Sequence, residues 1–306
     1  MSTQKRPILV VGSINMDLVA STPRIPRAGE TLIGSDFTTT PGGKGANQAV
    51  AVARLGHPVQ MIGAVGEDVF GEALLENLRA AGVGIEAVAR VPGPSGVAPI
   101  IVASSGENSI VVVPGANGKV TPAMIDQHAE RLRSAGMVLC QLELPLETVR
   151  HALALCAAAG VPVMLDPAPA ADLPDTVWKQ VTWFTPNETE AALYVGGSLG
   201  AKEAARKLLE KGVYGVVLKR GAEGSYVASA REEARRVKAF RVDAVDTVAA
   251  GDCFNGAFAV ALLEGQDPWS AAHFASAAAT ISVTRRGAQA SMPNRVEIDQ
   301  LLAEHA

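Results

Sequence analysis

Short segments that are apolar at almost every position alternate along this chain with longer segments of helical periodicity. Strands of this kind are typical of a parallel sheet that helices cover on both faces. The pattern therefore predicts an α/β fold, a three-layer sandwich around a central, mostly parallel sheet. Strands are expected at residues 8–14, 59–65, 137–142, 161–165, 182–185 and 213–219, and helices at 46–55, 71–81, 146–159 and 201–210.

Two segments interrupt this alternation. Residues 16–40 are rich in proline, glycine and alternating polar residues and have no helical period. Residues 96–113 contain two apolar runs that are joined by a turn at 104–108. We expect these segments to form a small β-sheet beside the α/β body, where it could cover a ligand as a lid. The whole chain, residues 1–306, is predicted to be one domain with this discontinuous lid.

Composition and charge argue against some classes of partner. The 306 residues are 48% hydrophobic and carry a formal net charge of −4, so the chain can bury a large core. Its one arginine-rich run, at 231–236, is broken by two glutamates and is predicted to be a solvated turn. Because Lys and Arg do not cluster elsewhere, we expect neither a nucleic acid nor a membrane surface as partner.

Three widely separated cysteines, Cys140, Cys156 and Cys253, show no metal-binding spacing. Such an odd and sparse set is typical of a reducing compartment rather than of a disulfide framework. The apolar run near the N-terminus covers only residues 8–11 before a glycine, which is too short for a signal peptide. These features predict a cytoplasmic protein.

The most informative segment covers residues 246–256. Apolar residues at 254, 257, 258, 261 and 262 form one stripe of a helix, which places Ala249, Ala250, Gly251 and Asp252 at its N-terminus. Small side chains leave the unpaired N–H groups of the first turn open, and the helix dipole adds positive charge there. The segment therefore predicts a site for an anion such as phosphate.

A carboxylate beside a phosphate site needs a reason, because like charges repel. Asp252 fits a general base that takes the proton of a hydroxyl group while that hydroxyl attacks a phosphate. The alternative is a simple helix cap, which is a very common use of aspartate. Two further groups of polar residues favour the catalytic interpretation.

The first group lies in the glycine-rich segment 41–48, which opens a predicted helix. The segment does not match the phosphate-loop pattern, because Lys44 is followed by glycine rather than by Ser or Thr. Glycines such as Gly43 permit close backbone approach, and Lys44 and Asn47 offer donors to neutral hydroxyl groups. An ordinary turn with a solvated Lys44 is the alternative.

The second group consists of polar side chains at the ends of strands. Asn15 and Asp17 follow the first predicted strand, and Glu143 follows the strand at 137–142. Ligands of open α/β sheets bind beyond the carboxyl ends of the strands, so these side chains could accept hydrogen bonds from vicinal sugar hydroxyls. Each of them alone could also be a loop carboxylate or a helix cap.

Two later segments fit a nucleotide and its metal ion. Asn187 and Glu190 follow the strand at 182–185, where they could cap a helix or act as oxygen ligands of Mg²⁺ or of its waters. The strand at 213–219 leads into a glycine-containing turn that could cover a nucleotide or be a plain β-turn. The residues of this turn are Lys219, Arg220, Gly221, Ala222, Glu223 and Gly224.

In their order along the chain, these segments resemble the ribokinase-like (PfkB) family of carbohydrate kinases. The family's broad features are the glycine-lysine turn and the Gly-Asp pair that starts a helix. The Asn15-x-Asp17 pair, the intact Gly-Gly-Lys-Gly-Ala-Asn run and the later Thr-Arg-Arg-Gly-Ala-Gln run are narrower, and resemble the members that phosphorylate ribose. The matching segments are 12–17, 42–49, 141–143, 185–190, 246–256 and 284–289.

This resemblance implies an ATP-dependent kinase that phosphorylates ribose at its terminal (5-) hydroxyl. Asp252 would be the base, and Ala249, Ala250 and Gly251 would form the anion hole for the transferred phosphoryl group. Mg²⁺ would lie near Glu190. The implied ligands of ribose are Asn15, Asp17, Gly43, Lys44, Asn47 and Glu143, and those of ATP are Asn187, the 219–224 turn and Ser276.

The resemblance also implies a site for K⁺ or another monovalent cation beside the anion hole. Lid strands in this family pair between subunits, which implies a homodimer. The counterparts of the cation ligands here are Asp246, Val248, Ser282, Arg285, Gly287 and Ser291.

Some positions depart from the family pattern, and other functions stay open. Cys253 stands where threonine is expected, Lys219-Arg220 replaces Thr-Leu, and Ser276 replaces a larger His or Asn. The acceptor could instead be 2-deoxyribose, fructose, a nucleoside or a keto-sugar acid. A non-catalytic sugar sensor would be expected to lack the Gly251-Asp252 pair, and a dinucleotide-dependent dehydrogenase would show GxGxxG after the first strand.

Overall fold

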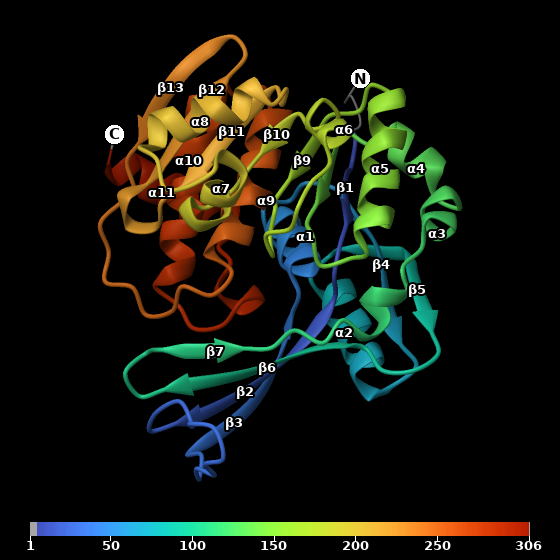
Figure 1. Ribbon diagram of the computed structural model, residues 1–306, viewed down its shortest axis with the longest axis vertical. Helices are drawn as coiled ribbons and strands as arrows, with labels where there is room; N and C mark the ends of the chain where they lie inside the picture. Colours follow the sequence, from blue (N-terminus) through green and yellow to red (C-terminus); the bar gives the residue numbers. More distant parts are fainter. Residues whose placement is uncertain (1–4, 306) are drawn as a thin grey trace.

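The computed structural model describes residues 5–305, and its centre is a nine-stranded sheet (Figure 1). The first seven strands in spatial order are parallel to one another, and each of the last two is antiparallel to the strand before it. In spatial order the strands are β5 (Gly84–Val91), β4 (Val59–Gly66), β1 (Ile8–Val11), β8 (Met137–Cys140), β9 (Val163–Leu165), β10 (Trp183–Phe184), β11 (Gly215–Lys219), β12 (Ser225–Ser229) and β13 (Glu232–Val237).

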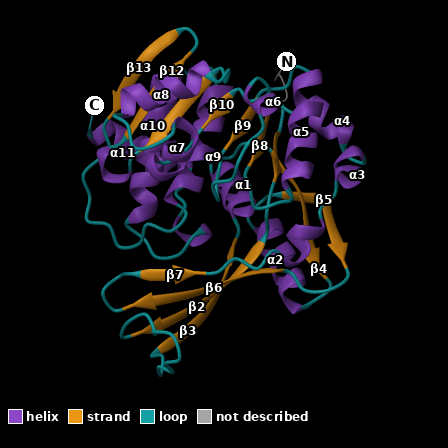
Figure 2. Ribbon diagram, viewed as in Figure 1, coloured by secondary structure: helices purple, strands orange, loops and turns teal. Residues whose placement is uncertain are grey.

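Helices cover both faces of the sheet, and Figure 2 shows them flanking the strands. Side chains of β1 alternate between the two apolar clusters: Ile8 and Val10 belong to one, Leu9 and Val11 to the other. This explains why the strand is apolar at every position. The first cluster includes α1 (Lys44–Arg54), α2 (Val69–Ala80), α9 (Ala250–Leu263), α10 (Pro268–Val283) and α11 (Arg295–Glu304), and the second α3 (Pro122–Asp126), α4 (Ala129–Ser134), α5 (Leu146–Ala158), α6 (Asp175–Trp178), α7 (Glu188–Val195) and α8 (Ala201–Glu210). The predicted three-layer α/β fold is confirmed.

A second, four-stranded sheet projects from this body, below it in Figures 1 and 2. Its strand order is β3-β2-β6-β7, with β2 (Asn15–Thr22) antiparallel to β3 (Asp36–Gly42) and β6 (Gly96–Ala103) antiparallel to β7 (Asn108–Ile110). The central pair, β2 and β6, is parallel. The small sheet therefore forms from the two segments in which it was predicted. Its action as a lid and the division into domains stay predictions.

The first strand is shorter than expected, and this moves two residues of interest. β1 ends at Val11, and β2 begins at Asn15, so Asn15 and Asp17 lie within the small sheet rather than in a loop beyond the first strand. Asp17 is held there because its backbone pairs with Thr40 on one side and Ala98 on the other.

The predicted turn at 231–236 was also wrong, because most of it forms the edge strand β13. Its charged residues face solvent, as is common for an edge strand. β5 and β12 were not predicted either, because β5 is only partly buried and β12 has only five residues. Within residues 5–305 no helix combines the length and the hydropathy that a membrane span requires.

Candidate active site

The N-terminus of α9 has the geometry of an anion site. Its N-cap residue, Ala249, adopts a left-handed conformation with φ 58° and ψ 11°, which an L-residue adopts at a cost. In the described part of the chain, the N–H groups of Gly251 and Asp252 have no protein acceptor, whereas that of Ala250 donates to the Thr247 carbonyl (3.3 Å). The expectation of open amides is thus correct for Gly251 and Asp252 but wrong for Ala250, because the tight turn uses that donor.

The Asp252 carboxylate is buried and held by two side-chain amides. Asn47 donates to Oδ2 (3.0 Å) and Gln48 donates to Oδ1 (3.1 Å), and the residue is 5% exposed. Burial raises the pKa of Asp252 and the neighbouring charge of Asp166 raises it further, while Lys44 and the two amides oppose the shift. Asp252 is therefore oriented by α1, and its carboxylate binds a proton more readily than a solvent-exposed aspartate does.

Gln48 links Asp252 to a second buried carboxylate. Its Nε2 also lies 3.1 Å from Asp166 Oδ2, and its Oε1 accepts a hydrogen bond from Gln141 (2.8 Å). The second oxygen of Asp166 accepts a hydrogen bond from Lys219 Nζ at 2.9 Å. Asp166 at the end of β9, Lys219 at the end of β11 and Asp252 at the start of α9 thus belong to one polar network.

Two more carboxylates lie near this network, Glu143 after β8 of the central sheet and Asp17 on β2 of the small sheet. Glu143 accepts hydrogen bonds from the Ser13 hydroxyl and from the backbone N–H of Lys44 (3.1 Å). Asp17 is buried, and burial together with the charges of Glu143 and Asp252 raises its pKa to about 7. Asp17, Glu143 and Asp252 therefore lie close enough to influence one another.

Lys44 provides a second positive charge near these acids, in addition to Lys219. Burial alone would lower the pKa of its ammonium group, but Asp252, Asp166 and Glu143 outweigh that effect and raise it. Lys44 is therefore charged at neutral pH. The turn before it is tight, since Gly43 has φ 87° and a Cβ atom there would lie 2.7 Å from the Asn15 nitrogen.

Two adjoining cavities lie next to the start of α9. The smaller has a volume of about 310 Å³ and contains Lys44, Asp166, Glu190 and Asp252. The larger, about 560 Å³, lies between the turn after β11 and α10 and contains Ser276 among mostly apolar residues. Both cavities are lined by Lys219, Gly221, Thr247, Ala250 and Gly251.

The sequence matches the pfkB family of carbohydrate kinases over residues 5–295. The chain belongs to this family. A ribokinase of Bacillus subtilis is 44% identical, covering 97% of this chain and all of that protein. A deoxyribokinase of Salmonella typhimurium is 39% identical over 97% of this chain and 98% of its own. The structure of Arabidopsis thaliana ribokinase complexed with ribose and ATP matches with a TM-score of 0.90 and 36% identity, covering 97% of this chain and 98% of that one.

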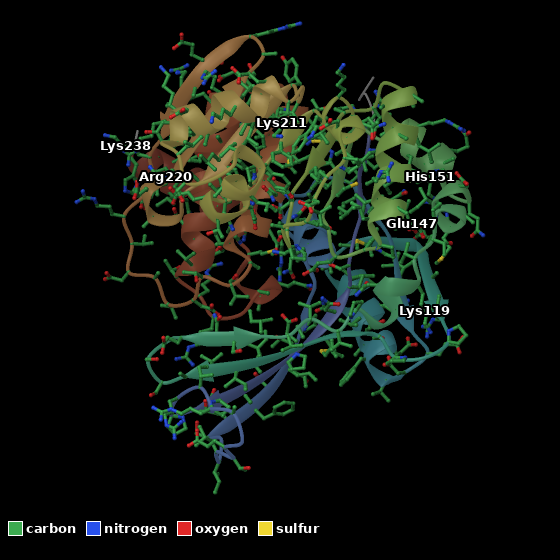
Figure 3. All side chains as sticks on the ribbon, in the orientation of Figure 1. Lys119, Glu147, His151, Lys211, Arg220 and Lys238 are labelled. Atoms are coloured by element: carbon green, nitrogen blue, oxygen red, sulfur yellow. The ribbon has the colours of Figure 1, made fainter. Side chains whose placement is uncertain are left out.

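In this kinase only part of the 219–224 turn, which was predicted to cover a nucleotide, lines the cavities. Gly221, Ala222 and Gly224 line the larger one. Arg220, labelled in Figure 3, instead pairs with Glu188 (2.7 Å) and Glu223 (2.6 Å). Neither Arg220 nor Glu223 lines the described cavities, because their side chains satisfy each other at the surface.

Asn187 and Glu190 form a capping box at the start of α7, which is the structural alternative that the sequence left open. Both residues also line the smaller cavity. Burial and the charge of Asp166 raise the pKa of Glu190. A cap and a metal-facing carboxylate are compatible here, because the capping bonds leave lone pairs on the Glu190 oxygens.

The segments expected to hold a monovalent cation meet beside α9. The Asp246 carboxylate accepts the N–H groups of Val248 (3.0 Å) and Gly287 (2.9 Å). The Ser282 carbonyl accepts the N–H group of Arg285 at 3.1 Å, and the Ser291 hydroxyl bonds to the Ala288 carbonyl instead. Within residues 5–305, no group of three or more His, Cys, Asp or Glu side chains forms a metal cluster.

Sequence reasoning missed several buried polar residues of this site. Asp166 follows the apolar strand β9 directly, so the strand-end argument used for Glu143 could have found it. Asn117 donates to the Asn15 side chain (2.6 Å), and Gln289 donates to that of Asn47 (3.1 Å). No local signal distinguishes these two from surface amides.

Proposed function

We propose that this kinase transfers the γ-phosphoryl group of ATP to the 5-hydroxyl of D-ribose. The hydroxyl proton passes to Asp252, the hydroxyl oxygen bonds to the γ-phosphorus, and the bond to the β–γ bridging oxygen breaks to release ADP. The observation that carries the proposal is the position of Asp252: its buried carboxylate stands beside the open amides of α9, next to the junction of the two cavities.

The acceptor sugar is assigned to the side of Asp252 that faces the small sheet. Carboxylates accept hydrogen bonds from vicinal hydroxyls, a role that suits Asp17 and Glu143, and Lys44 supplies a charged donor. The residues assigned to the sugar are charged, polar or glycine, and none of them is an aromatic side chain on which a nucleobase could stack. This composition suits a compact polyol. The full set assigned to ribose is Asn15, Asp17, Gly43, Lys44, Asn47, Glu143 and Asp252.

ATP is assigned to the larger cavity, with its terminal phosphates at the start of α9. The N–H groups of Gly251 and Asp252 would receive the transferred group, and the left-handed Ala249 turns the chain so that they face outward. The mostly apolar walls of the cavity near Ser276 suit a nucleobase. Gly221, Ala222 and Gly224 would cover it from the turn after β11.

The smaller cavity also fits a divalent cation with its water shell. Its oxygen donors, from Asn187 and Glu190, are the hard ligands that Mg²⁺ prefers. Mg²⁺, when bound, neutralises charge on the β- and γ-phosphates. A monovalent cation such as K⁺ would be held by Asp246 and by the backbones of Val248, Ser282, Arg285 and Gly287, with Ser291 close by.

We further assign a homodimer through the small sheet, and a cytoplasmic location. Phe37 on β3 and Ile110 on β7 are 61% and 50% exposed, and pairing of the small sheet with a second subunit would bury them. The three cysteines are buried and free, as a reducing compartment allows.

A second acceptor, 2-deoxyribose, is favoured by the 39% identity to a deoxyribokinase. One experiment separates the candidates: coupled measurement of ADP release with ribose, 2-deoxyribose, fructose and adenosine, each with and without potassium. Ribose is expected to give the highest kcat/KM, and potassium to increase turnover. A higher kcat/KM with 2-deoxyribose would replace the proposed substrate, and ribose binding without ADP release from any sugar would reject a kinase.

A further inference from the structure

Lys219 is the last residue of β11 and is positioned by a buried ion pair. Its Nζ lies 2.9 Å from Oδ1 of Asp166, and the two side chains are 15% and 3% exposed. Asp166 follows β9, and β10 separates the two strands, so the pair spans the end of the intervening strand. A buried charge is costly without a partner, so the carboxylate holds the ammonium group at the carboxyl edge of the sheet.

This ammonium group stands at the entrance of the α9 anion site. A Cβ atom built on Gly251 would lie 3.4 Å from Lys219 Nζ, which is contact distance. Lys219 also lines both cavities, together with Gly251 and Ala250. An anion that bound the open N–H groups of Gly251 and Asp252 would therefore meet Lys219 as well.

The Lys219–Asp166 pair is also connected to Asp252, on the side of the site assigned to the acceptor sugar. Asp166 Oδ2 accepts the Gln48 amide that donates to Asp252 Oδ1. One amide thus ties the carboxylate that holds Lys219 to the carboxylate that faces the acceptor. The Lys219 ammonium group and the Asp252 carboxylate are therefore held at fixed positions relative to each other, as stabilisation of a transition state requires.

We infer that Lys219 is a catalytic residue whose ammonium group contacts an oxygen of the phosphoryl group in transit, and that Asp166 is the positioning residue that holds it there. This inference rests on the proposed kinase function. As the bond to the β–γ bridging oxygen breaks and the new O–P bond forms, negative charge spreads over the equatorial oxygens. Lys219 stabilises that charge beside the open N–H groups of Gly251 and Asp252, while Lys44 lies among Asp252, Asp166 and Glu143.

A cycle of variants tests this assignment: Lys219→Met, Asp166→Asn and the double variant. Asn at 166 can still accept the Gln48 hydrogen bond, so the change removes the charge but not that contact. Lys219→Met is expected to lower kcat at least ~100-fold, on the scale of losing one preorganised charge stabiliser. Asp166→Asn should lower kcat roughly 10-fold, since the ammonium group loses its anchor. Affinity for ADP, which lacks the transferred group, should change less than about 3-fold.

The double variant separates catalysis from folding. Lys219→Met leaves Asp166 unpaired and buried, so its Tm should fall, and adding Asp166→Asn should restore it. If Lys219 contacts the phosphoryl group, kcat of the double variant stays as low as that of Lys219→Met alone. Recovery of kcat together with Tm would show that the lysine is only structural and would overturn the inference.

Lys202→Met is the matched control, because Lys202 on α8 forms an exposed ion pair with Glu233 on β13. It should leave kcat, ADP affinity and Tm unchanged. Wild-type turnover of ribose with an equally active Lys219→Met variant would reject this inference alone. Absence of turnover in the wild type with every sugar would reject the proposed function and this inference with it.

Discussion

Both oxygens of Asp252 accept hydrogen bonds from amide groups of α1, and this arrangement decides what a substitution does there. Asparagine has nearly the same shape but only one acceptor oxygen, so one of the two donors would face an NH₂ group. Asp252→Asn should lower kcat at least ~100-fold, the usual scale for removing a general base, while ADP still binds.

Steady-state turnover of ribose and calorimetric ADP affinity check this prediction. Asp126→Asn is the control, because that exposed carboxylate pairs with His151 on the surface. Near-normal kcat in Asp252→Asn would remove Asp252 from the role of base. Loss of ADP affinity as well would mean that the variant disturbs the α9 start rather than the proton transfer.

Asp17 gives the site a pH dependence of predictable sign. Its pKa is raised to about 7, so the carboxylate is mostly protonated at pH 6 and mostly ionised at pH 8. The ionised form accepts two sugar hydroxyls, whereas the protonated form must donate one of its bonds. KM for ribose should therefore fall as the pH rises from 6 to 8. In Asp17→Asn, KM should be high and should lose this dependence, and an unchanged pH profile would contradict the assignment.

The same shift makes a prediction about stability. Because the folded-state pKa lies above the ordinary value of 3.8, Asp17 binds a proton more tightly in the folded state. Its contribution to the free energy of unfolding is greatest at low pH and is lost as the pH rises to about 7. In the absence of sugar, Asp17→Asn should thus have a higher Tm than the wild type at pH 8. The difference should shrink towards pH 4, and a lower Tm at pH 8 would argue against this account of Asp17.

At the scale of elements, the end of β3 shapes the space for the Asp17 carboxylate. A Cβ atom on Gly42 would lie 2.2 Å from Asp17 Oδ2. Gly42→Ala should therefore displace that carboxylate and raise KM for ribose roughly 10-fold, the cost of about 1.4 kcal/mol of lost binding. Affinity for ADP should stay unchanged, since neither Gly42 nor Asp17 lines the cavity assigned to the nucleotide.

Gly200→Ala is the matched control for this change. Gly200 precedes α8, and a Cβ atom there would meet nothing within 4 Å. Both variants should fold, and only Gly42→Ala should change KM. A normal KM in Gly42→Ala would show that the small sheet adjusts its backbone, or that Asp17 does not contact the sugar.

Strand–helix alternation was enough to predict the α/β fold, because buried parallel strands and amphipathic helices leave distinct local patterns. It also located the α9 start, since the apolar stripe after Asp252 marks where the helix begins. Register and side-chain pairing have no such local signal. Asn15 and Asp17 moved into β2 through pairing with strands distant in sequence, and Arg220 turned to Glu188. Asp166 was missed because one polar residue after a strand is common in any sheet.

At the scale of the whole molecule, the small sheet combines exposed apolar side chains with two buried residues that are proposed sugar ligands, Asn15 and Asp17. Both of its edge strands are open, since β3 and β7 each pair on one side only within the described residues. Open edges with exposed apolar side chains favour pairing with another chain. The dimer and the completed sugar site would then depend on each other.

Replacing one apolar side chain on each open edge strand by an acid tests that dependence. Sedimentation velocity should find a dimer for the wild type and a monomer for Phe37→Glu combined with Ile110→Glu, because like charges and desolvation would oppose sheet pairing. KM for ribose should rise, since a free sheet holds Asn15 and Asp17 less firmly, while ADP affinity should persist. Val296→Glu is the control, because Val296 is 64% exposed on α11, away from the small sheet. A monomeric wild type, or a double variant that remains a dimer, would show that the edge strands of the small sheet do not join two subunits.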